Sequence, residues 1–501
     1  MPQKTVYFGR FISTPQPNEL LIRTGAALVN RKDGRGTIEK MDWTVGSPQD
    51  AVHKYGIDTP VVTAKDNGFF FPGFIGECFH SYWDLRNRKS LTLWTRKMAN
   101  GCLQTDTHIH ASQYPNVGIF GKSTLLDWLT TYTFPLESSL GNPKSPMYRN
   151  ATEPPDPLAR AKTVYNRVIS RTLANGTTTA SYYATIHLDA TNLLADIAFA
   201  RGQRAYIGRV CMDRPETCPE YYRDESTEQT IAHTKASIEH CRSLDVSGEL
   251  LAPIITPRFA PSCLPETLSQ LGALAKAEDL RVQTHISENL SEISLVKQLF
   301  PDQTTYTDVY DHHELLTPRT ILAHAVHLSQ DEMRLIKQRK TKISHCPASN
   351  SALGSGFCPV RVMLDEGLEV GLGTDVSGGY STSILDAVRN ACMVSRHVGY
   401  VNGGDSRYNL GVAEGLWLAT VGGAKVVGMQ GRLGGFEEGM LWDVQEIVLD
   451  EVDPNGERGE TEVDIFGWET WEDRVEKWVW NGDDRNVRRV WVGGRLVHER
   501  Q

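Results

Sequence analysis

Short apolar runs and helical stretches alternate through the middle of the chain. The runs recur eight times between about Leu103 and Val426. Such alternation predicts parallel strands joined by crossover helices, and eight is the number of strands in a (β/α)8 barrel. The sequence therefore predicts an α/β fold built on a TIM-like barrel. The predicted strands are 102–110, 177–186, 204–212, 253–259, 281–285, 320–324, 342–345 and 368–374.

The two ends of the chain show a different pattern, in which apolar runs follow one another without helices between them. Around the Gly493-Gly494 turn, residues 490–497 predict a β-hairpin. We expect both termini to meet in one small β-sandwich domain beside the barrel, with a loop at 450–462. The other predicted strands of this domain are 6–12, 19–29, 69–71 and 445–449. The predicted boundaries are 1–75 and 427–501 for the β-sandwich, 76–105 for an insertion and 106–426 for the barrel.

Composition and charge restrict the partners. The 501 residues are 40% hydrophobic and 23% charged, with a formal net charge of -9. Such a mildly acidic protein binds polyanions poorly, so we expect no nucleic-acid partner, and any base that it handles is a free one. The nine cysteines include no CxxC pair, which argues against disulfides and a thiolate zinc site. Since the start lacks a signal peptide and no apolar stretch approaches about 20 residues, we expect a cytoplasmic protein without a membrane partner.

Polar side chains lie at the ends of four predicted strands, which is where barrel enzymes build their active sites. His108 and His110 are two residues apart, so both can point to one side of a strand and bind one metal ion. His285, His324 and Asp375 end three later strands. Each feature also has a purely structural interpretation. A histidine pair can be two hydrogen-bonded polar residues, and an aspartate can be a helix N-cap. The ordered set predicts a zinc hydrolase site.

Zinc held by three histidines and one aspartate would lower the pKa of a bound water to about 7. Asp375 would accept a proton from this water, and His324 would polarise its oxygen. Glu288 follows His285 by three residues and would deliver protons to a ring nitrogen and to a leaving amine. The fourth predicted strand offers no lysine to bridge a second metal, so we predict a mononuclear site. His345 is a weaker candidate, for which we favour a structural role.

Longer motifs around these residues carry a family resemblance. The chain resembles guanine deaminases of the amidohydrolase superfamily, and the matching motifs extend over most of its length. This coverage is more specific than the metal ligands, which many amidohydrolases share. The segments that carry the resemblance are 106–114, 126–129, 132–135, 176–180, 210–213, 256–259, 285–289, 344–350, 373–379 and 482–486.

The resemblance implies conversion of guanine and water to xanthine and ammonia by a homodimer with one zinc ion per chain. It implies Glu288 as the acid and base. The implied zinc ligands are His108, His110, His285 and Asp375. The implied substrate-binding residues are His110, Gln113, Arg258, Phe259, His285, Glu288 and Asp375.

The implied purine pocket suits its ligand. A guanidinium from Arg258 can pair with the O6/N7 edge of guanine, the Gln113 amide can hydrogen-bond the base, and the Phe259 ring can stack on it. Adenine carries a donor where guanine has O6, so we expect Arg258 to reject adenine. The alternatives are an ion-pair role for Arg258 and a core role for Phe259.

Residues 76–105 depart from the family pattern. The family runs directly from a Pro-Gly-Phe-Ile strand into Asp-Thr-His-Ile-His, whereas thirty residues separate Ile75 from Asp106 here. We interpret these residues as a translated intron. Codons for Gly76-Glu77-Cys78 can contain the splice donor GTGAGT, and codons for Thr105-Asp106 can contain the acceptor ACAG. Removing what lies between them restores a single Asp codon in frame; the alternative is a tolerated surface loop.

Two other functions stay open from the residues. A related amidohydrolase could act on another aminated heterocycle, such as a triazine or an oxidised purine. Alternatively, the insertion could leave an inactive gene product or a binding protein without turnover. The zinc deaminase class that uses H-x-E with P-C-x-x-C is excluded, because the chain lacks the P-C-x-x-C motif.

Overall fold

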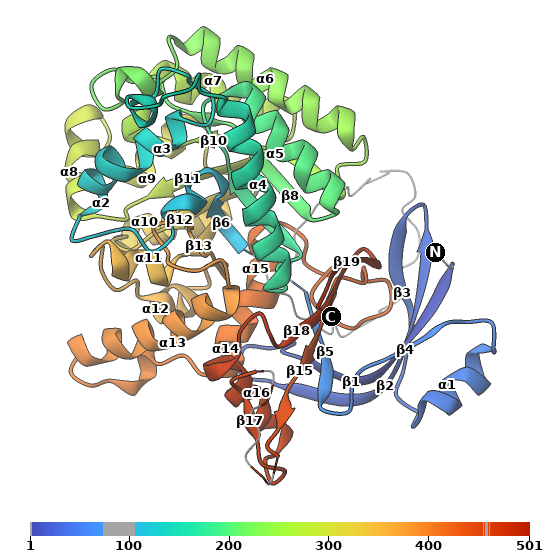
Figure 1. Ribbon diagram of the computed structural model, residues 1–501. Helices are drawn as coiled ribbons and strands as arrows, with labels where there is room; N and C mark the ends of the chain where they lie inside the picture. Colours follow the sequence, from blue (N-terminus) through green and yellow to red (C-terminus); the bar gives the residue numbers. More distant parts are fainter. Residues whose placement is uncertain (1–2, 74–105, 454, 456–458, 460, 501) are drawn as a thin grey trace, which may run out of the picture.

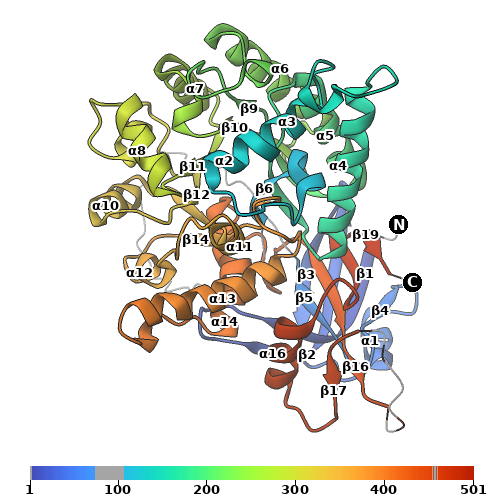
Figure 2. The same cartoon turned by 60° about the vertical axis from the view of Figure 1, so that its left-hand side comes forward.

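The chain folds into a barrel and a β domain that lies beside it (Figure 1). The computed structural model describes residues 3–73, 106–453, 455, 459 and 461–500. The insertion predicted at 76–105 therefore lies outside the described residues. Figure 2 shows the helices arranged around the barrel strands, with the strands from both termini gathered below them. Among the described residues, no helix combines the length and apolar character needed to cross a membrane.

The barrel sheet contains the eight predicted strands in sequence order. Neighbouring strands are parallel wherever their register is defined, from β6 next to β7 through to β13 next to β14. The prediction of an eight-stranded barrel is thus confirmed. The short strand β9 (Val210–Cys211) adds to β10 after β8 has ended. The strands are β6 (Asp106–His110), β7 (Thr179–Tyr183), β8 (Arg204–Gly208), β10 (Leu251–Pro257), β11 (Arg281–Ile286), β12 (Thr320–His324), β13 (Lys342–His345) and β14 (Val370–Leu372).

Backbone hydrogen bonds close the ring between its last and first strands. The Asp375 N–H donates to the His108 carbonyl at 2.9 Å, and the His110 N–H donates to the Val376 carbonyl at 3.1 Å. Gly371 and Gly373 make this closure possible, since a Cβ at Gly373 would lie 2.9 Å from the Cβ of His108. The small-residue strand therefore approaches β6 closely and places Asp375 beside the histidine pair.

Helices cover the outside of the barrel, and their ends follow local capping signals. The side chains of Asp156, Ser226 and Ser329 accept backbone N–H bonds at the starts of three of them. The α5 helix ends at Gly202, whose φ of 75° is the left-handed value that favours glycine. The longer barrel helices are α4 (Pro157–Ala174), α5 (Leu188–Arg201), α6 (Thr227–Leu244), α7 (Pro265–Ala277), α8 (Leu290–Leu299), α9 (Tyr306–His312), α10 (Gln330–Arg339) and α13 (Ile384–Val401).

Shorter helices fill the connections near the barrel mouth and the return to the β domain. Several contribute to the site described below, above all α3 and the 3₁₀ segments η1 and η4. Their bounds are η1 (Ala111–Asn116), α2 (Leu125–Trp128), η2 (Leu129–Thr133), α3 (Phe134–Ser138), η3 (Pro146–Tyr148), η4 (Glu220–Tyr222), η5 (Ala260–Ser262), α11 (Pro347–Ala352), α12 (Val360–Asp365), η6 (Ser406–Tyr408), α14 (Val412–Trp417), η7 (Leu418–Gly422) and α15 (Gly423–Val426).

Strands from both termini meet in one sheet, as predicted. Its order is β19-β18-β15-β5-β1-β2-β3, with β4 paired to β1, so the predicted sandwich takes the form of a single eight-stranded sheet. The predicted hairpin is confirmed, with Gly493 at φ 51° and Gly494 at φ 72° between its strands. The strands are β1 (Lys4–Ser13), β2 (Leu21–Lys32), β3 (Arg35–Asp42), β4 (Val61–Thr63), β5 (Gly68–Pro72), β15 (Val444–Val448), β18 (Val487–Val492) and β19 (Arg495–Glu499). The predicted loop 450–462 begins with a short strand, β16 (Asp450–Glu451). This strand pairs with β17 (Asp464–Ile465), which follows the loop.

The expectation of terminal segments without helices was wrong at two places. The α1 helix (Pro48–Tyr55) begins after Ser47, whose hydroxyl accepts the Asp50 N–H. The α16 helix (Trp471–Asn481) begins at a capping box formed by Thr470 and Asp473. It buries one face, with Val475, Trp478 and Val479 packed in the core. Side-chain capping and 3.6-residue periodicity outweighed the strand-like composition of the flanks.

A buried ion pair joins the barrel to the terminal sheet. Arg204 of β8 donates to both carboxylate oxygens of Asp443 at 3.3 and 3.4 Å, and both side chains are almost fully buried. Asp443 also accepts the Gly493 N–H at 2.6 Å. One carboxylate thus contacts the first residue of a barrel strand and the turn of the C-terminal hairpin.

Replacing Asp443 by Ala should lower the free energy of unfolding by about 3–5 kcal/mol, because the buried Arg204 would lose its partner. Denaturant unfolding measures the change. A suitable control is Asp331→Ala, which breaks the exposed Asp331–Arg334 pair and should cost about 1 kcal/mol or less. An Asp443 variant that loses no more stability than this control would contradict the prediction.

Candidate active site

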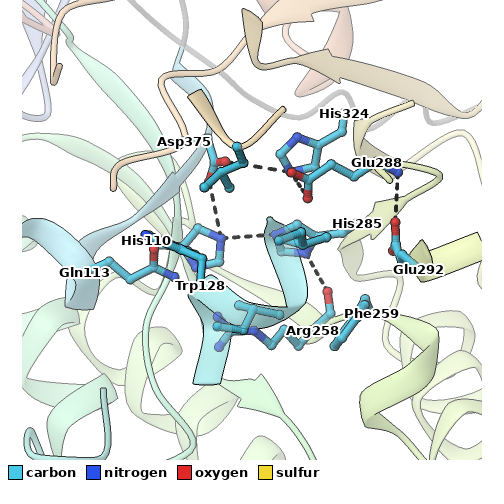
Figure 3. A pocket seen from close by; sticks show the side chains of 13 residues that line it. His110, Gln113, Trp128, Arg258, Phe259, His285, Glu288, Glu292, His324 and Asp375 are labelled. Carbon is cyan, nitrogen blue, oxygen red and sulfur yellow. Dashed lines mark hydrogen bonds and ion pairs between the residues drawn. The ribbon is translucent and has the colours of Figure 1, made fainter. Parts of the chain in front are cut away.

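A pocket opens at the C-terminal ends of the barrel strands (Figure 3). Polar and aromatic groups from distant parts of the chain line it together. They are His110, Gln113, Trp128, Arg258, Phe259, His285, Glu288, Glu292, His324 and Asp375, with Leu125, Leu129 and Leu353 as further apolar wall.

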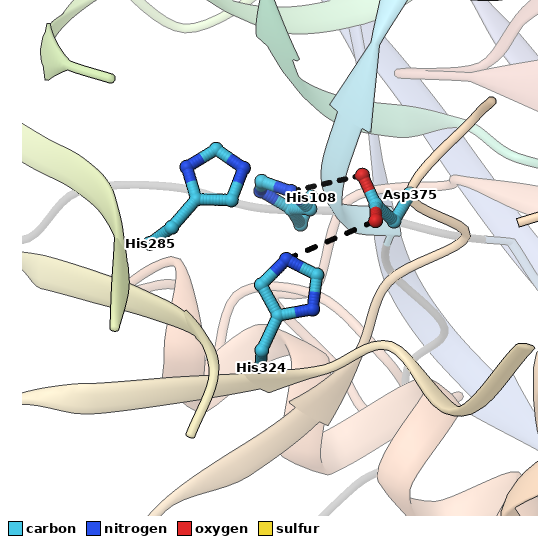
Figure 4. Close-up of side chains that lie close together, drawn as sticks. All are labelled: His108, His285, His324 and Asp375. Atoms are coloured by element: carbon cyan, nitrogen blue, oxygen red, sulfur yellow. Dashed lines mark ion pairs between the residues drawn. The ribbon is translucent and has the colours of Figure 1, made fainter. Parts of the chain in front are cut away.

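The predicted metal-binding side chains converge on one side of this pocket. Ligand atoms of His108, His285, His324 and Asp375 all lie within 4.8 Å of one another (Figure 4). His110 joins them, since its Nε2 lies 3.1 Å from the His285 Nε2 and 3.5 Å from the Asp375 Oδ1. Five residues from four separate strands thus meet, and any three histidines with the aspartate form a donor set that suits a divalent metal.

Hydrogen bonds from surrounding groups orient the imidazole rings. The His285 Nδ1 lies 2.6 Å from the Arg258 carbonyl, which can only accept, so Nδ1 carries the proton and Nε2 faces the cluster with its lone pair. The His324 Nδ1 lies 2.9 Å from the Asn350 Oδ1. Asn350 belongs to the segment 344–350 that carries the resemblance, but the sequence alone did not identify this contact.

The strand-end backbone is strained where the site is built. His324 and Asp375 have φ values of 72° and 46°, in the left-handed region that non-glycine residues rarely adopt. Asp106, buried at the start of β6, accepts the Thr374 N–H at 3.0 Å and the Thr374 hydroxyl at 2.6 Å. This carboxylate fixes the residue that precedes Asp375 and thereby stabilises its unusual backbone.

Burial determines the charge states of the cluster. It lowers the pKa of His110 and of His285 well below the usual value, so both rings are neutral and able to bind a metal. Burial opposes ionisation of Asp375, but the nearby His108 outweighs it and the pKa of this carboxyl falls below its usual value. His110 and His285 are therefore neutral beside an ionised Asp375, whereas the pKa of His324 is raised, because the nearby carboxyls of Glu288 and Asp375 outweigh its burial.

Glu288 faces the cluster from the loop after β11. Its Oε1 accepts the Ser355 hydroxyl at 3.0 Å, and its Oε2 lies 3.4 Å from the His324 Nε2. Burial raises the pKa of Glu288 to about 7. Behind it, Glu292 accepts the Glu288 N–H at 2.9 Å and thus fixes the backbone of this loop. A buried carboxyl that titrates near neutrality can both give and take a proton.

The predicted purine-binding residues form the adjoining wall. Arg258 and Phe259 follow β10, and Gln113 enters from η1 (Figure 3). The ion-pair alternative for Arg258 also holds, because its Nη1 donates to the Glu137 Oε2 at 2.6 Å. Sequence reasoning missed Glu137, although it lies two residues beyond the segment 132–135, which carries part of the resemblance.

His345 stays apart from this arrangement. It ends β13 but neither lines the pocket nor belongs to the group of metal-binding side chains. Neither ring nitrogen has a hydrogen-bond partner among the described residues, and burial lowers its pKa to about 3. The structural role of His345 therefore stays a prediction.

Comparisons with known proteins agree with a metal-dependent hydrolase barrel. The model of the amidohydrolase family matches residues 104–497, which is most of the chain. The chain therefore belongs to the amidohydrolase family.

Its relatives identify the branch of this family that it resembles. It is 44% identical over 495 residues to the probable guanine deaminase of Schizosaccharomyces pombe, a match that covers 98% of this chain and 83% of that protein. It is 42% identical over 396 residues to the guanine deaminase of Homo sapiens, which covers 78% and 81% of the two chains. A crystal structure of guanine deaminase from C. acetobutylicum with bound guanine aligns with a TM-score of 0.79 and 30% identity, over 99% of this chain and 100% of that one. The resemblance to guanine deaminases is confirmed.

Proposed function

We propose that the protein hydrolyses guanine to xanthine and ammonia, as a step of purine breakdown. The observation that carries the proposal is the pocket itself, in which a buried guanidinium, an amide and an aromatic ring adjoin the histidine and aspartate cluster. The similarity to guanine deaminases over 98% of the chain supports the same substrate.

The residues present fit a zinc ion. The donors are the Nε2 atoms of His108, His110 and His285 together with Asp375 Oδ1, and three of their separations are 3.1, 3.1 and 3.5 Å. Tetrahedral zinc with bonds of about 2.0–2.1 Å separates its ligand atoms by about 3.3 Å, in agreement with these values. His324 is also close, since its Nε2 lies 3.8 Å from the Asp375 Oδ2 and its ring belongs to the group of side chains whose ligand atoms lie within 4.8 Å of one another. We place His324 outside the ligand set because the resemblance to guanine deaminases implies His108, His110, His285 and Asp375 as the ligands, and we propose one ion per chain.

The chain's own groups then divide the proton transfers. When bound, zinc would supply Lewis-acid activation of the attacking water. Asp375 accepts a proton from this water, and His324 polarises its oxygen. Glu288 gives its proton to a ring nitrogen, then receives the proton that Asp375 took from the water and gives it to the leaving amine. The hydroxyl that has added to the carbon reprotonates Glu288, so its buried carboxyl is the acid and base of the reaction. Ser355 holds this carboxyl toward the pocket through the 3.0 Å hydrogen bond.

The wall that adjoins the cluster recognises the purine. Arg258 offers N–H donors to the O6/N7 edge of guanine, Gln113 hydrogen-bonds the base, and Phe259 stacks on the ring. His110, His285, Glu288 and Asp375 contact the substrate from the side where the amine leaves. Adenine places an amino donor where Arg258 requires an acceptor, so it is excluded.

The roles of His110 and His324 are separable by experiment. His110→Ala should lose its metal on dialysis, because it removes a ligand. His324→Ala should keep its metal and lose turnover by about 10²–10³-fold, the usual cost of removing one polarising donor. Metal analysis beside initial rates measures both. If His324→Ala empties the site as fully as His110→Ala, then His324 belongs to the ligand set.

Guanine turnover tests the substrate. The purified protein should release equal amounts of xanthine and ammonia from guanine, and a chelator should abolish this release until Zn²⁺ is restored. Adenine, a triazine and an oxidised purine serve as comparison substrates under the same conditions. Faster turnover of one of these compounds would assign the protein to another aminated heterocycle. No turnover of guanine or of any of these compounds would indicate an inactive gene product.

We also propose that the protein is a cytoplasmic homodimer. The seven cysteines of the described residues are all free and buried, which supports a reducing compartment. The dimer rests on the family resemblance. Sedimentation of the purified protein would show a mass of two chains if this is correct.

We also propose that residues 76–105 are a retained intron and that the functional chain lacks them. A Cβ on Gly73 would collide with the Thr178 side chain, so Gly73 lies against the residue just before β7. Asp106 lies opposite Ala180 in the β6–β7 register. Thr178 and Ala180 are two residues apart, and an extended residue spans about 3.3–3.6 Å. The two residues that remain after the deletion can therefore bridge Gly73 and Asp106, which supports a chain that continues directly into β6.

Transcripts and a deletion variant test this proposal. Reading messages across the junction should reveal a spliced form in which one Asp codon follows Ile75, and the absence of such a message would refute the intron. A chain without residues 76–105 should bind zinc more tightly than the full chain and turn over guanine faster. If both chains behave alike, the segment is a tolerated loop in the protein.

A further inference from the structure

Glu137 lies directly behind the purine-binding wall and contacts most of its polar groups. It comes from α3 and its side chain is fully buried. Its Oε2 accepts the Arg258 Nη1 and the Tyr222 hydroxyl, both at 2.6 Å. Its Oε1 accepts the Gln113 Nε2 at 2.9 Å, with longer contacts from the Arg258 Nη2 at 3.4 Å and the Ser112 hydroxyl at 3.3 Å. Glu137 does not line the pocket.

The charge of Glu137 is what makes a buried Arg258 tolerable. Arg258 is 2% exposed, and an arginine cannot lose its proton, so its charge needs a partner within the protein. The contact with both Nη atoms of Arg258 fixes the plane of the guanidinium, because a carboxylate and a guanidinium pair in one plane. The remaining N–H groups of Arg258 can then point into the pocket in one direction only.

The same carboxylate fixes the Gln113 amide. A carboxylate accepts only, so the amide nitrogen must face Glu137, while the amide oxygen accepts the Ser377 N–H at 3.3 Å on the other side. A flipped amide would place its oxygen against the carboxylate and its NH2 group against a backbone donor. Gln113 therefore offers the pocket a defined pattern of one N–H and one lone pair.

We infer that Glu137 is the positioning residue that sets the selectivity of the pocket for a 6-oxopurine. It acts by holding Arg258 and Gln113 in the only orientation in which their donors match the O6/N7 edge. The inference rests on the proposed function, but it concerns binding of the purine edge and not turnover. A purine that lacks the 6-oxo group gains nothing from this orientation.

Binding of two unreactive purines tests the inference. Hypoxanthine carries the 6-oxo group and purine lacks it, so the ratio of their dissociation constants reports on this edge. The intact zinc protein should bind hypoxanthine at least tenfold more tightly than purine. In Glu137→Gln the ratio should fall to threefold or less, because the neutral amide brings an NH2 donor against the donors of Arg258, Gln113 and Tyr222. Metal content should be unchanged, and the KM for guanine should rise more than kcat falls.

Two further variants complete the design. Tyr222→Phe removes one hydrogen bond to the same carboxylate without touching Arg258 or Gln113, so it should keep the wild-type ratio. Glu137→Asp keeps the charge at a shorter reach and should give an intermediate ratio, which provides the test if Glu137→Gln does not fold. A folded, zinc-loaded Glu137→Gln that retains the wild-type ratio would overturn the inference, as would an unchanged ratio in Glu137→Asp. These results hold whether or not guanine proves to be the substrate, so failure of the proposed function would be seen separately.

Discussion

The closure of the barrel between β14 and β6 is the constraint on which the rest of the structure depends. Two backbone hydrogen bonds join the segment after β14 to β6, one of them from Asp375 itself to the His108 carbonyl. Because these two residues lie more than 260 positions apart in the chain, only ring closure brings a carboxylate to the histidine pair. Every other part of the site is arranged around that meeting point, since β11 and β12 supply their histidines across the same mouth.

Buried carboxyl groups are the second feature that organises the site. Asp106, Glu137 and Glu292 are all buried, yet none of them lines the metal cluster. Each accepts two or more hydrogen bonds, which offsets the cost of removing a carboxylate from water. Asp106 fixes the approach to Asp375, Glu137 holds the guanidinium of Arg258, and Glu292 holds the loop that presents Glu288. The groups that line the pocket are thus positioned by a surrounding layer of acidic residues.

Much of this could be predicted from the sequence, and the exceptions within the site share a cause. The strands of the barrel and the histidines at their ends follow from periodicity and spacing, which are local properties. The partners Glu137, Ser355 and Asn350 could not be found in this way, because a lone Glu, Ser or Asn has many uses and its meaning depends on contacts across the fold. The positive φ at His324 and Asp375 carries no sequence signal either, since it is imposed by tertiary contacts on residues that locally prefer other conformations. The helices α1 and α16 were missed for a different reason, as their capping residues were present but outweighed in our reading by neighbouring strand-like runs.

Asp106 links the fold, the site and the unusual segment that precedes it. Its carboxylate accepts two hydrogen bonds from Thr374, and its backbone is the first residue of β6 that pairs with β7. The barrel therefore needs an aspartate at this position with or without residues 76–105. Splicing would join the first base of the Gly76 codon to the last two bases of the Asp106 codon, which again encodes an aspartate. The shortened chain would therefore keep every contact that Asp106 makes. An insertion placed one residue later would separate Asp106 from Thr107 and His108 and break the strand. The boundary of the segment therefore falls at the last position where extra residues leave β6 unchanged.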